Sequence, residues 1–366
     1  MIVLFLCLVI TAGLLQALIL RHGLDKVSYT LDISERFVEC DQKFDVTAVI
    51  ENRKLLPVLF LRLDEYYPKP IDIDTDNSPV SVSESSALIP DSVKLSQTMY
   101  LLSNQRIRRT LSVSFPNRGV KTFRDAVLTG GDLFGTREDS KTAPLRHTVI
   151  VLPKRLDAPE LEDTFGNFLG DMSVRRYILE DPVLTLSFRE YTGREPMKDI
   201  SWPRSLRDGK LMVKQYDYTM ELSATVILNV APVSGEPEDE EQNLAALERA
   251  LSLARGVCEY LEHKKVSYNF QTNAIAAGIS GAWASGGDGL GRGHLMSILE
   301  GLGAATAFAS KPFSRLMEDA INRAESGRAH ILITTGMDGE RASLVRQAEG
   351  RIGSKIFLID AYQEVS

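Results

Sequence analysis

The run SATVILNVAP, from Ser223 to Pro232, is a continuous apolar segment of the length of one strand. An uninterrupted run of this kind is typical of a parallel strand that is buried on both faces of its sheet. After an acidic stretch, Leu244, Leu247, Leu251 and Ala254 recur at the spacing of one face of a helix. This part of the sequence therefore predicts a buried strand that is followed by an amphipathic helix.

The same alternation continues to the carboxyl terminus. The further predicted strands are VSYNFQT (Val266–Thr272), AHILITTG (Ala329–Gly336) and KIFLID (Lys355–Asp360). The predicted helices between and around them are His294–Ala305, Pro312–Ser326 and Glu340–Gly350. Alternating strands and helices indicate a parallel sheet with helices on both faces. We therefore expect residues 221–366 to form an α/β domain on a Rossmann-like parallel sheet.

The first half of the chain has a different pattern. Its strand-like runs, rich in β-branched and aromatic residues, are KVSYTLDI, FDVTAVIEN, VLFLRLDEYY, RRTLSVSF and HTVIVLP, at residues 26–33, 44–52, 58–67, 108–115 and 147–153. Turn residues such as Asn52-Arg53 and Pro116-Asn117 separate them. Several short strands without helical periodicity between them predict a β-sandwich over residues 26–155.

The amino terminus is apolar. Residues 1–20 contain no charged side chain, and a bilayer-spanning helix needs about 20 apolar residues. No basic region precedes this stretch, as it would in a signal peptide, and the cations Arg21, Lys26 and Arg36 follow it. By the positive-inside rule we expect a transmembrane anchor over residues 1–22 of a single-pass cell-membrane protein, with the bulk of the chain cytoplasmic. A cleaved signal peptide is the alternative.

Composition and motifs argue against several classes of function. The net charge of −7 over 366 residues does not suit a nucleic-acid partner. The three cysteines and five histidines have no metal-ligand spacing, and HExxH, GxSxG and phosphate-loop motifs are absent from the sequence. GGDGLGRG at residues 286–293 resembles a dinucleotide fingerprint but lacks its βαβ placement. We expect no enzyme and no cofactor; a hydrolase assembled from distant residues is an alternative.

A polar and aromatic segment, residues 156–220, links the two halves. Its motifs, in order, are Arg189-Glu190-Tyr191, Gly193-Arg194, Ile200-Ser201-Trp202, Ser205-Leu206-Arg207 and Gly209-Lys210-Leu211. Upstream motifs are Arg118-Gly119, Asp132-Leu133-Phe134-Gly135 and Val151–Lys154. This ordered set resembles the domain-of-unknown-function 58 family. The chain departs from the family pattern at Arg194, where the family usually has Asp.

The resemblance implies a von Willebrand factor A-like domain and a partnership with a MoxR-type AAA+ ATPase. An intact domain of this type holds a divalent cation through carboxylate and hydroxyl oxygens, which such ions prefer. The corresponding positions here are Asn229, Ala231, Val233 and Thr335, which supply no carboxylate. We therefore expect that the metal site is lost. The alternative is a ligand-binding module that still uses a cation through Asn229 and the acidic run 236–241.

The linking segment is the candidate interaction site. Its singled-out residues are Arg189, Glu190, Tyr191, Gly193, Asp199, Trp202, Ser205, Arg207 and Gly209. Arg and aromatic side chains are enriched in interface hot spots. The same side chains could instead be internal, with Trp202 packed between domains and Arg207 paired with Asp199 or Glu190. Our leading hypothesis is a non-enzymatic, membrane-anchored scaffold that works with the ATPase in assembling or remodelling client proteins.

Overall fold

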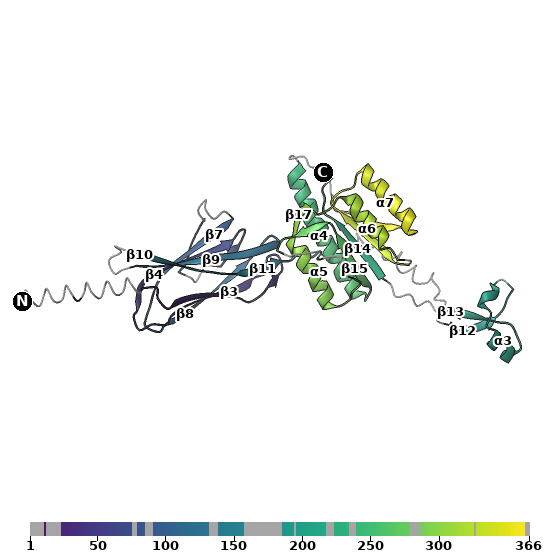
Figure 1. Cartoon of the computed structure of the whole chain (residues 1–366), viewed down its shortest axis with the longest axis horizontal. Coiled ribbons are helices and arrows are strands. Elements are labelled where there is room, and N and C mark those ends of the chain that lie inside the picture. The colour runs from purple at the N-terminus through teal and green to yellow at the C-terminus, as the bar shows by residue number, and fades with distance from the viewer. Residues whose placement is uncertain are drawn as a thin grey trace, which may run out of the picture. The chain divides into compact units, whose positions relative to one another are not determined.

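The chain forms two compact units, Met1–Lys154 and Arg155–Ser366. The computed structural model describes residues 23–74, 79–84, 91–131, 138–156, 185–193, 195–216, 223–233, 239–278, 287–325 and 327–362, with Thr11 and Trp283. Figure 1 shows that the first unit is built of strands and that helices pack on strands in the second.

The first unit contains two sheets. Its strands are β1 (Val27–Ile33), β2 (Phe37–Val38), β3 (Phe44–Asn52), β4 (Val58–Pro68), β5 (Asp72–Ile73), β6 (Ser81–Glu84), β7 (Ser92–Leu101), β8 (Arg106–Ser114), β9 (Gly119–Gly131), β10 (Glu138–Ala143) and β11 (His147–Val151). One sheet has the order β1-β3-β8-β5 and the other β2-β11-β9-β4-β7-β6, with β10 also paired to β9. All these pairs are antiparallel except β2 with β11.

The period-two pattern of the strands explains the core of this unit. In β3, Phe44, Val46, Ala48 and Ile50 are buried and belong to one apolar cluster, because successive side chains of a strand point to opposite faces. The cluster also contains residues of β1, β4, β7, β8, β9 and β11. Burial of these side chains from both sheets holds the first unit together.

The second unit contains a four-stranded parallel sheet of order β15-β14-β18-β19. Its strands and helices are β14 (Ser223–Asn229), α4 (Glu240–His263), β15 (Ser267–Thr272), α5 (Arg292–Ala304), α6 (Phe313–Asn322), β18 (Ala329–Thr334), α7 (Gly339–Ile352) and β19 (Ile356–Asp360). A two-stranded antiparallel piece joins β16 (Ala274–Ala276) to β17 (Ala305–Ala309). Ile227 and Leu332 of the sheet form an apolar cluster with α6 and α7.

A small module lies in the sequence between the strands of the first unit and the parallel sheet of the second. It consists of β12 (Thr185–Glu190), the 3₁₀ turn η1 (Met197–Asp199), α3 (Trp202–Asp208) and β13 (Met212–Tyr216). Strands β12 and β13 form their own antiparallel sheet. We call residues 185–216 the hairpin module.

The fold class predicted from the sequence needs correction. We expected an α/β protein on a Rossmann-like, von Willebrand factor A-like parallel sheet, preceded by a β-sandwich and a transmembrane helix. Among the described residues most strands lie in antiparallel sheets, and the parallel sheet is small, with four strands. The reason is that the apolar runs of the second half supply only these four parallel strands, whereas the first half supplies two mainly antiparallel sheets of four and seven strands.

The predicted membrane location is corrected as well. The expected anchor over residues 1–22 lies outside the described residues, apart from Thr11. Within the described part of the chain, no helix is long and apolar enough to cross a membrane. The longest described helix, α4, carries charged residues such as Glu248, Arg249 and Glu259 among its apolar ones. The predicted single-pass membrane protein therefore has no spanning helix among these residues.

Candidate functional site

The hairpin module is held together by polar groups that bond to one another. Ser205 Oγ donates a hydrogen bond to the Ser201 carbonyl oxygen and accepts one from the Met212 backbone N–H, both at 2.8 Å. Ser201, Ser205, Ile200 and Val213 are buried. Helix α3 therefore lies against β13 through its serine side, and this bonding accounts for the serine at position 205.

Two glycines of the module have a left-handed backbone. Gly209 has φ 67° and is the C-cap of α3, and Gly193 has φ 85° in the loop after β12. A left-handed backbone at these positions favours glycine because it has no Cβ. Near Gly209, the Tyr191 backbone N–H donates to the Leu211 carbonyl at 2.8 Å. Gly193, Gly209 and Tyr191 thus have local structural roles in the module.

Ion pairs use most of the acidic side chains of the module. Arg189 pairs with Glu195 at 2.7 Å and Lys210 with Glu190 at 2.7 Å. Thr192 donates to Glu195 through its hydroxyl at 2.7 Å and its backbone N–H at 3.0 Å. The Thr192 hydrogen bonds, together with the Arg189 charge, lower the pKa of Glu195 to about 2. The loop after β12 is therefore held by an ion pair and two hydrogen bonds to Glu195.

Besides the Ser205 hydrogen bonds, helix α3 has polar contacts through Arg204. Arg204 pairs with Asp208 at 2.7 Å, and its guanidinium lies 5.7 Å from the centre of the Phe188 ring. Arg207 is exposed and forms no ion pair with any described residue. Glu190, one of its expected partners, is paired with Lys210 instead. Asp199 is half-buried in η1. The expected pairing of Arg207 with Glu190 is thus not formed.

Large apolar side chains lie on the surface of the module. Trp202 is 55% exposed and Leu206 84% exposed, and the two are one helical turn apart on one side of α3. Met197, in the turn before the helix, is 69% exposed. Met197 and Leu206 are not among the site residues predicted from the sequence; the four-residue spacing of Trp202 and Leu206 is the signal that points to Leu206. The pair Trp202 and Leu206 is an exposed apolar surface of the kind that can mark an interaction site.

The carboxyl end of the parallel sheet brings the four degenerate metal positions together. Asn229, at the end of β14, is fully buried. Its amide nitrogen donates to Thr334 Oγ1 at 3.0 Å and to the Ala231 carbonyl at 3.3 Å. Its amide oxygen accepts from the Ala231 N–H at 3.2 Å and from Asn273 Nδ2 at 2.8 Å. These bonds use both donors and both lone pairs of the amide.

An arginine joins the loops at this end of the sheet. Arg341, in the first turn of α7, donates to the Gly336 carbonyl at 2.9 Å and to the Pro232 carbonyl at 2.6 Å. Arg341 is 9% exposed, and its burial lowers the pKa of the guanidinium. A buried cation here repels a second cation. No sequence motif pointed to Arg341, because the loop that it joins to its own, at Pro232, lies 109 residues away in the chain.

The other two degenerate positions are also used internally. Thr335 Oγ1 donates to the Ala231 carbonyl at 2.8 Å. Val233 packs on Gly336, where an added Cβ would lie 2.6 Å from Val233 Cγ2. Among the described residues no group of three or more His, Cys, Asp or Glu is placed to hold a metal ion. This end of the sheet is arranged as a set of internal hydrogen bonds.

The glycine-rich stretch is tied to the sheet and to α4. Gly289 exchanges two backbone hydrogen bonds with Tyr268 of β15, at 3.0 and 3.1 Å. The Gly291 N–H donates to both carboxylate oxygens of Glu262, at 2.8 and 3.0 Å. This N–H, which a phosphate would need in a dinucleotide site, is already bonded to the chain's own carboxylate.

A polar hollow of about 370 Å³ lies beside this stretch. Its lining residues are Asn269, Gln271, Gly287, Asp288, Arg323, Glu325 and Arg328. The buried Arg328 binds both carboxylate oxygens of Asp288 and pairs with Glu325 at 2.7 Å. Hydrogen bonds from Arg328 hold the pKa of Asp288 below its usual range. The charges of Asp288, Glu325 and Arg328 in the lining are thus paired with one another.

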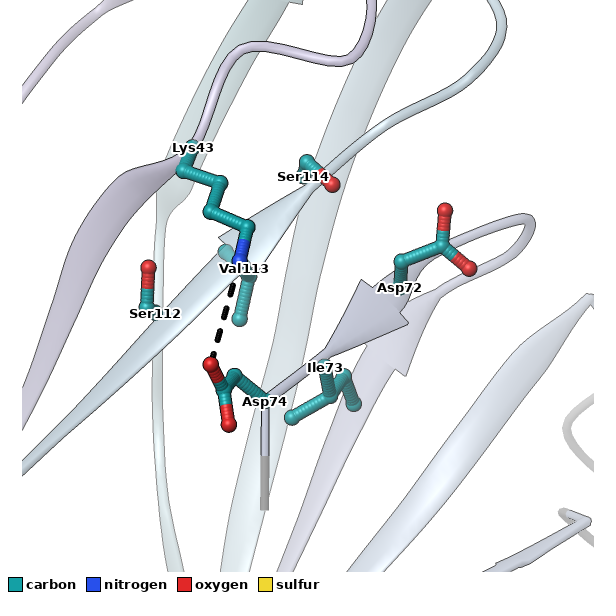
Figure 2. A pocket seen from close by; sticks show the side chains of 7 residues that line it. All are labelled: Lys43, Asp72, Ile73, Asp74, Ser112, Val113 and Ser114. Carbon is teal, nitrogen blue, oxygen red and sulfur yellow. Dashed lines mark ion pairs between the residues drawn. The ribbon is translucent and has the colours of Figure 1, made fainter. Parts of the chain in front are cut away.

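A second hollow, of about 300 Å³, lies at the edge of the first unit beside β5 and β8. Figure 2 shows Lys43 reaching toward Asp74, while Asp72 points away from this pair. The Lys43–Asp74 distance is 3.8 Å, and the two side chains are 71% and 49% exposed. A surface ion pair of this kind contributes little free energy. The hairpin module is therefore the stronger candidate site.

Comparison with known proteins gives partial likenesses only. No family model matches the chain, and no curated protein matches it. A cohesin module of a family 33 glycoside hydrolase from Clostridium perfringens is 13% identical, covering 33% of this chain and 96% of that one, with a TM-score of 0.21. The CARDB domain of a Pyrococcus furiosus protein is 11% identical, covering 35% and 90%, with a TM-score of 0.21.

A non-cellulosomal cohesin from Archaeoglobus fulgidus is 15% identical, covering 37% of this chain and 96% of that one, with a TM-score of 0.23. TM-scores at this level support no conclusion about function. The functional argument therefore depends on the geometry of the chain itself.

Proposed function

We propose that this chain is a non-catalytic interaction protein that binds protein partners through the hairpin module. The observation that carries the proposal is the exposure of Trp202 and Leu206, 55% and 84%, on one side of α3. Burying large apolar side chains of this kind contributes about 1.5–3 kcal/mol each. A partner that covers this side of α3 would gain that free energy.

The remainder of the module supports a binding role. The Ser205 and Glu195 bonds fix the loop and the helix relative to the two strands. A helix and loop that are already fixed lose little backbone conformational entropy on binding, which favours affinity. Tryptophan is also among the residue types most enriched in hot spots.

The partner that we propose is a MoxR-type AAA+ ATPase. The support is the resemblance of residues 189–211 to the domain-of-unknown-function 58 family, which implies that partnership. In this proposal the ATPase supplies the free energy for remodelling client proteins, and this chain acts as the scaffold that holds ATPase and client together.

The test is affinity purification of the full-length chain from its native cell extract, followed by mass spectrometry. We expect an AAA+ ATPase with the wild-type chain and a loss of about tenfold or more with Trp202→Ala/Leu206→Ala, as for two hot-spot residues. The matched control is Leu55→Ala/Tyr100→Ala in the first unit, where the side chains are 82% and 64% exposed. Recovery of the same proteins with all three chains would overturn the proposal.

A further inference from the structure

The hairpin module differs in charge from the remainder of the chain. Residues 185–216 contain seven Lys or Arg and four Asp or Glu, a net charge of +3. The whole chain carries −7, so the residues outside the module carry −10. The module is a basic segment of an acidic protein, and its charge therefore requires its own explanation.

The acidic side chains of the module are largely neutralised within it. Glu195, Glu190 and Asp208 pair with Arg189, Lys210 and Arg204, each at 2.7 Å. In contrast, Lys198, Arg207 and Lys214 form no ion pair with any described residue. The excess charge is therefore available to a partner.

Two of these cations adjoin the exposed apolar residues in the sequence. Lys198 follows Met197 in η1, and Arg207 follows Leu206 in α3. Both cations are exposed. We call Met197, Lys198, Trp202, Leu206 and Arg207 the α3 patch. It combines large apolar side chains with positive charge that no described acidic residue pairs with.

From this combination we infer that the α3 patch binds an acidic segment of a protein partner that also carries apolar side chains. This inference rests on the proposed function and deepens it. Opposite charges steer association and select the partner, while Trp202 and Leu206 supply the apolar contact. The negative charge of the other residues keeps the acidic segment away from the remainder of the chain.

A membrane surface is the competing anionic partner, and the geometry favours it less. Helices that lie in a lipid interface have a long apolar face and a polar face rich in Lys and Arg. Helix α3 has seven residues, and its Arg204 is already paired with Asp208. The free cations are few, which suits a short acidic peptide segment better than an extended lipid surface.

The experiment uses the fluorescence of Trp202 in the full-length chain. Iodide quenching should first find Trp202 accessible; a shielded Trp202 would mean that the chain covers its own patch, which would overturn the inference. Trp202→Phe assigns the signal, because the chain has two tryptophans. The probe is a synthetic peptide rich in Glu and Leu in a Gly-Ser background.

We expect the peptide to shift the Trp202 emission to shorter wavelength, with an affinity that falls between about 0.05 and 0.5 M salt. Lys198→Glu/Arg207→Glu should weaken binding about tenfold or more, as expected for reversed charges at an interface. The matched control is Arg323→Glu/Lys355→Glu, two exposed cations of the second unit. It should leave the affinity within about threefold of wild type.

The outcomes separate the inference from the proposed function. Equal binding of a peptide with Gln in place of Glu would overturn the acidic partner and leave the apolar contact standing. No peptide binding, with the co-purified partner still lost in Trp202→Ala/Leu206→Ala, would overturn the inference alone. No peptide binding and no loss of the partner would overturn both. A Trp202 shift with phosphatidylglycerol vesicles that needs Lys198 and Arg207 would replace the protein segment by a lipid surface.

Discussion

At the scale of single residues, the clearest feature of the first unit is a charge network inside the sandwich. Glu65 is 1% exposed and binds both Arg109 and the Tyr29 hydroxyl. Arg109 also donates to Gln97 Oε1 at 2.7 Å. Burial and the Glu65 charge raise the pKa of Tyr29, so that Tyr29 remains a hydrogen-bond donor.

We predict that Glu65→Ala lowers the free energy of unfolding by about 3–5 kcal/mol, because it leaves the Arg109 charge buried without a partner. The control is Glu138→Ala, which removes the exposed Arg62–Glu138 pair at 3.4 Å. Its expected cost is below about 1 kcal/mol. Denaturant unfolding of the full-length chain measures both. Equal losses would contradict the assignment of a buried pair.

A second prediction at this scale concerns pH and Glu195. Its pKa is lowered to about 2 in the folded module, so its contribution is complete above its ordinary pKa of 4.5 and is lost as the pH falls through about 2. NMR titration of the Thr192 amide should therefore show no transition near pH 4.5 from this carboxylate. Glu195→Gln should abolish the low-pH transition. A midpoint at the ordinary value would show that the Thr192 and Arg189 contacts do not form.

At the scale of elements, two helix glycines differ in their surroundings. In α5, a Cβ added to Gly301 would lie 1.9 Å from the Trp283 ring. In α7, a Cβ at Gly350 would meet no atom within 4 Å. The Trp283 ring also stacks on Phe270, with the ring centres 5.7 Å apart. Gly301 is therefore needed for close packing, whereas Gly350 is not.

We predict opposite effects of the same substitution. Gly350→Ala should raise stability by about 0.5–1 kcal/mol, since alanine favours a helix over glycine. Gly301→Ala should lower it by about 1–3 kcal/mol, because the added methyl overpacks the contact with Trp283. Chemical unfolding followed by circular dichroism gives both values. If Gly301→Ala were stabilising, Trp283 would not lie on α5.

At the scale of the whole molecule, the first unit has an apolar core of its own. A unit with its own core can fold without the remainder of the chain. We predict that residues 23–154, expressed alone, unfold cooperatively on heating, and that Glu65→Ala lowers the midpoint of that transition. Calorimetry of the fragment is the measurement. A fragment without a cooperative transition would show that this core is insufficient.

Much of the local structure could be predicted from the sequence. Strand β14 (Ser223–Asn229) lies within the apolar run that starts at Ser223, and α4 covers the helical pattern of Leu244 to Ala254. The relative size of the antiparallel and parallel sheets could not be predicted, and the fold class and the membrane location needed correction. Single-sequence patterns locate elements but do not say which sheets join or how large they become.

The candidate site shows the same division. The order of the motifs predicted a site over residues 189–209, and Gly193 and Gly209 have the left-handed backbone that favours glycine. Which side chains of the module would be bonded internally and which exposed was not evident from the motifs. Ser205 is buried and doubly bonded, whereas Leu206, its neighbour, is 84% exposed.

The sequence by itself located many of the strands and helices, although not β7 or β9, because the burial of alternate or every third to fourth side chain is a local periodic property. Only the tertiary structure decided the contacts between distant residues. Arg341 bonds to the carbonyl of Pro232, and Arg109 to Glu65, although the partners of each pair lie far apart in the sequence. Such pairs leave no periodic trace in the sequence, since their free energy depends on burial and geometry that arise only when the elements pack.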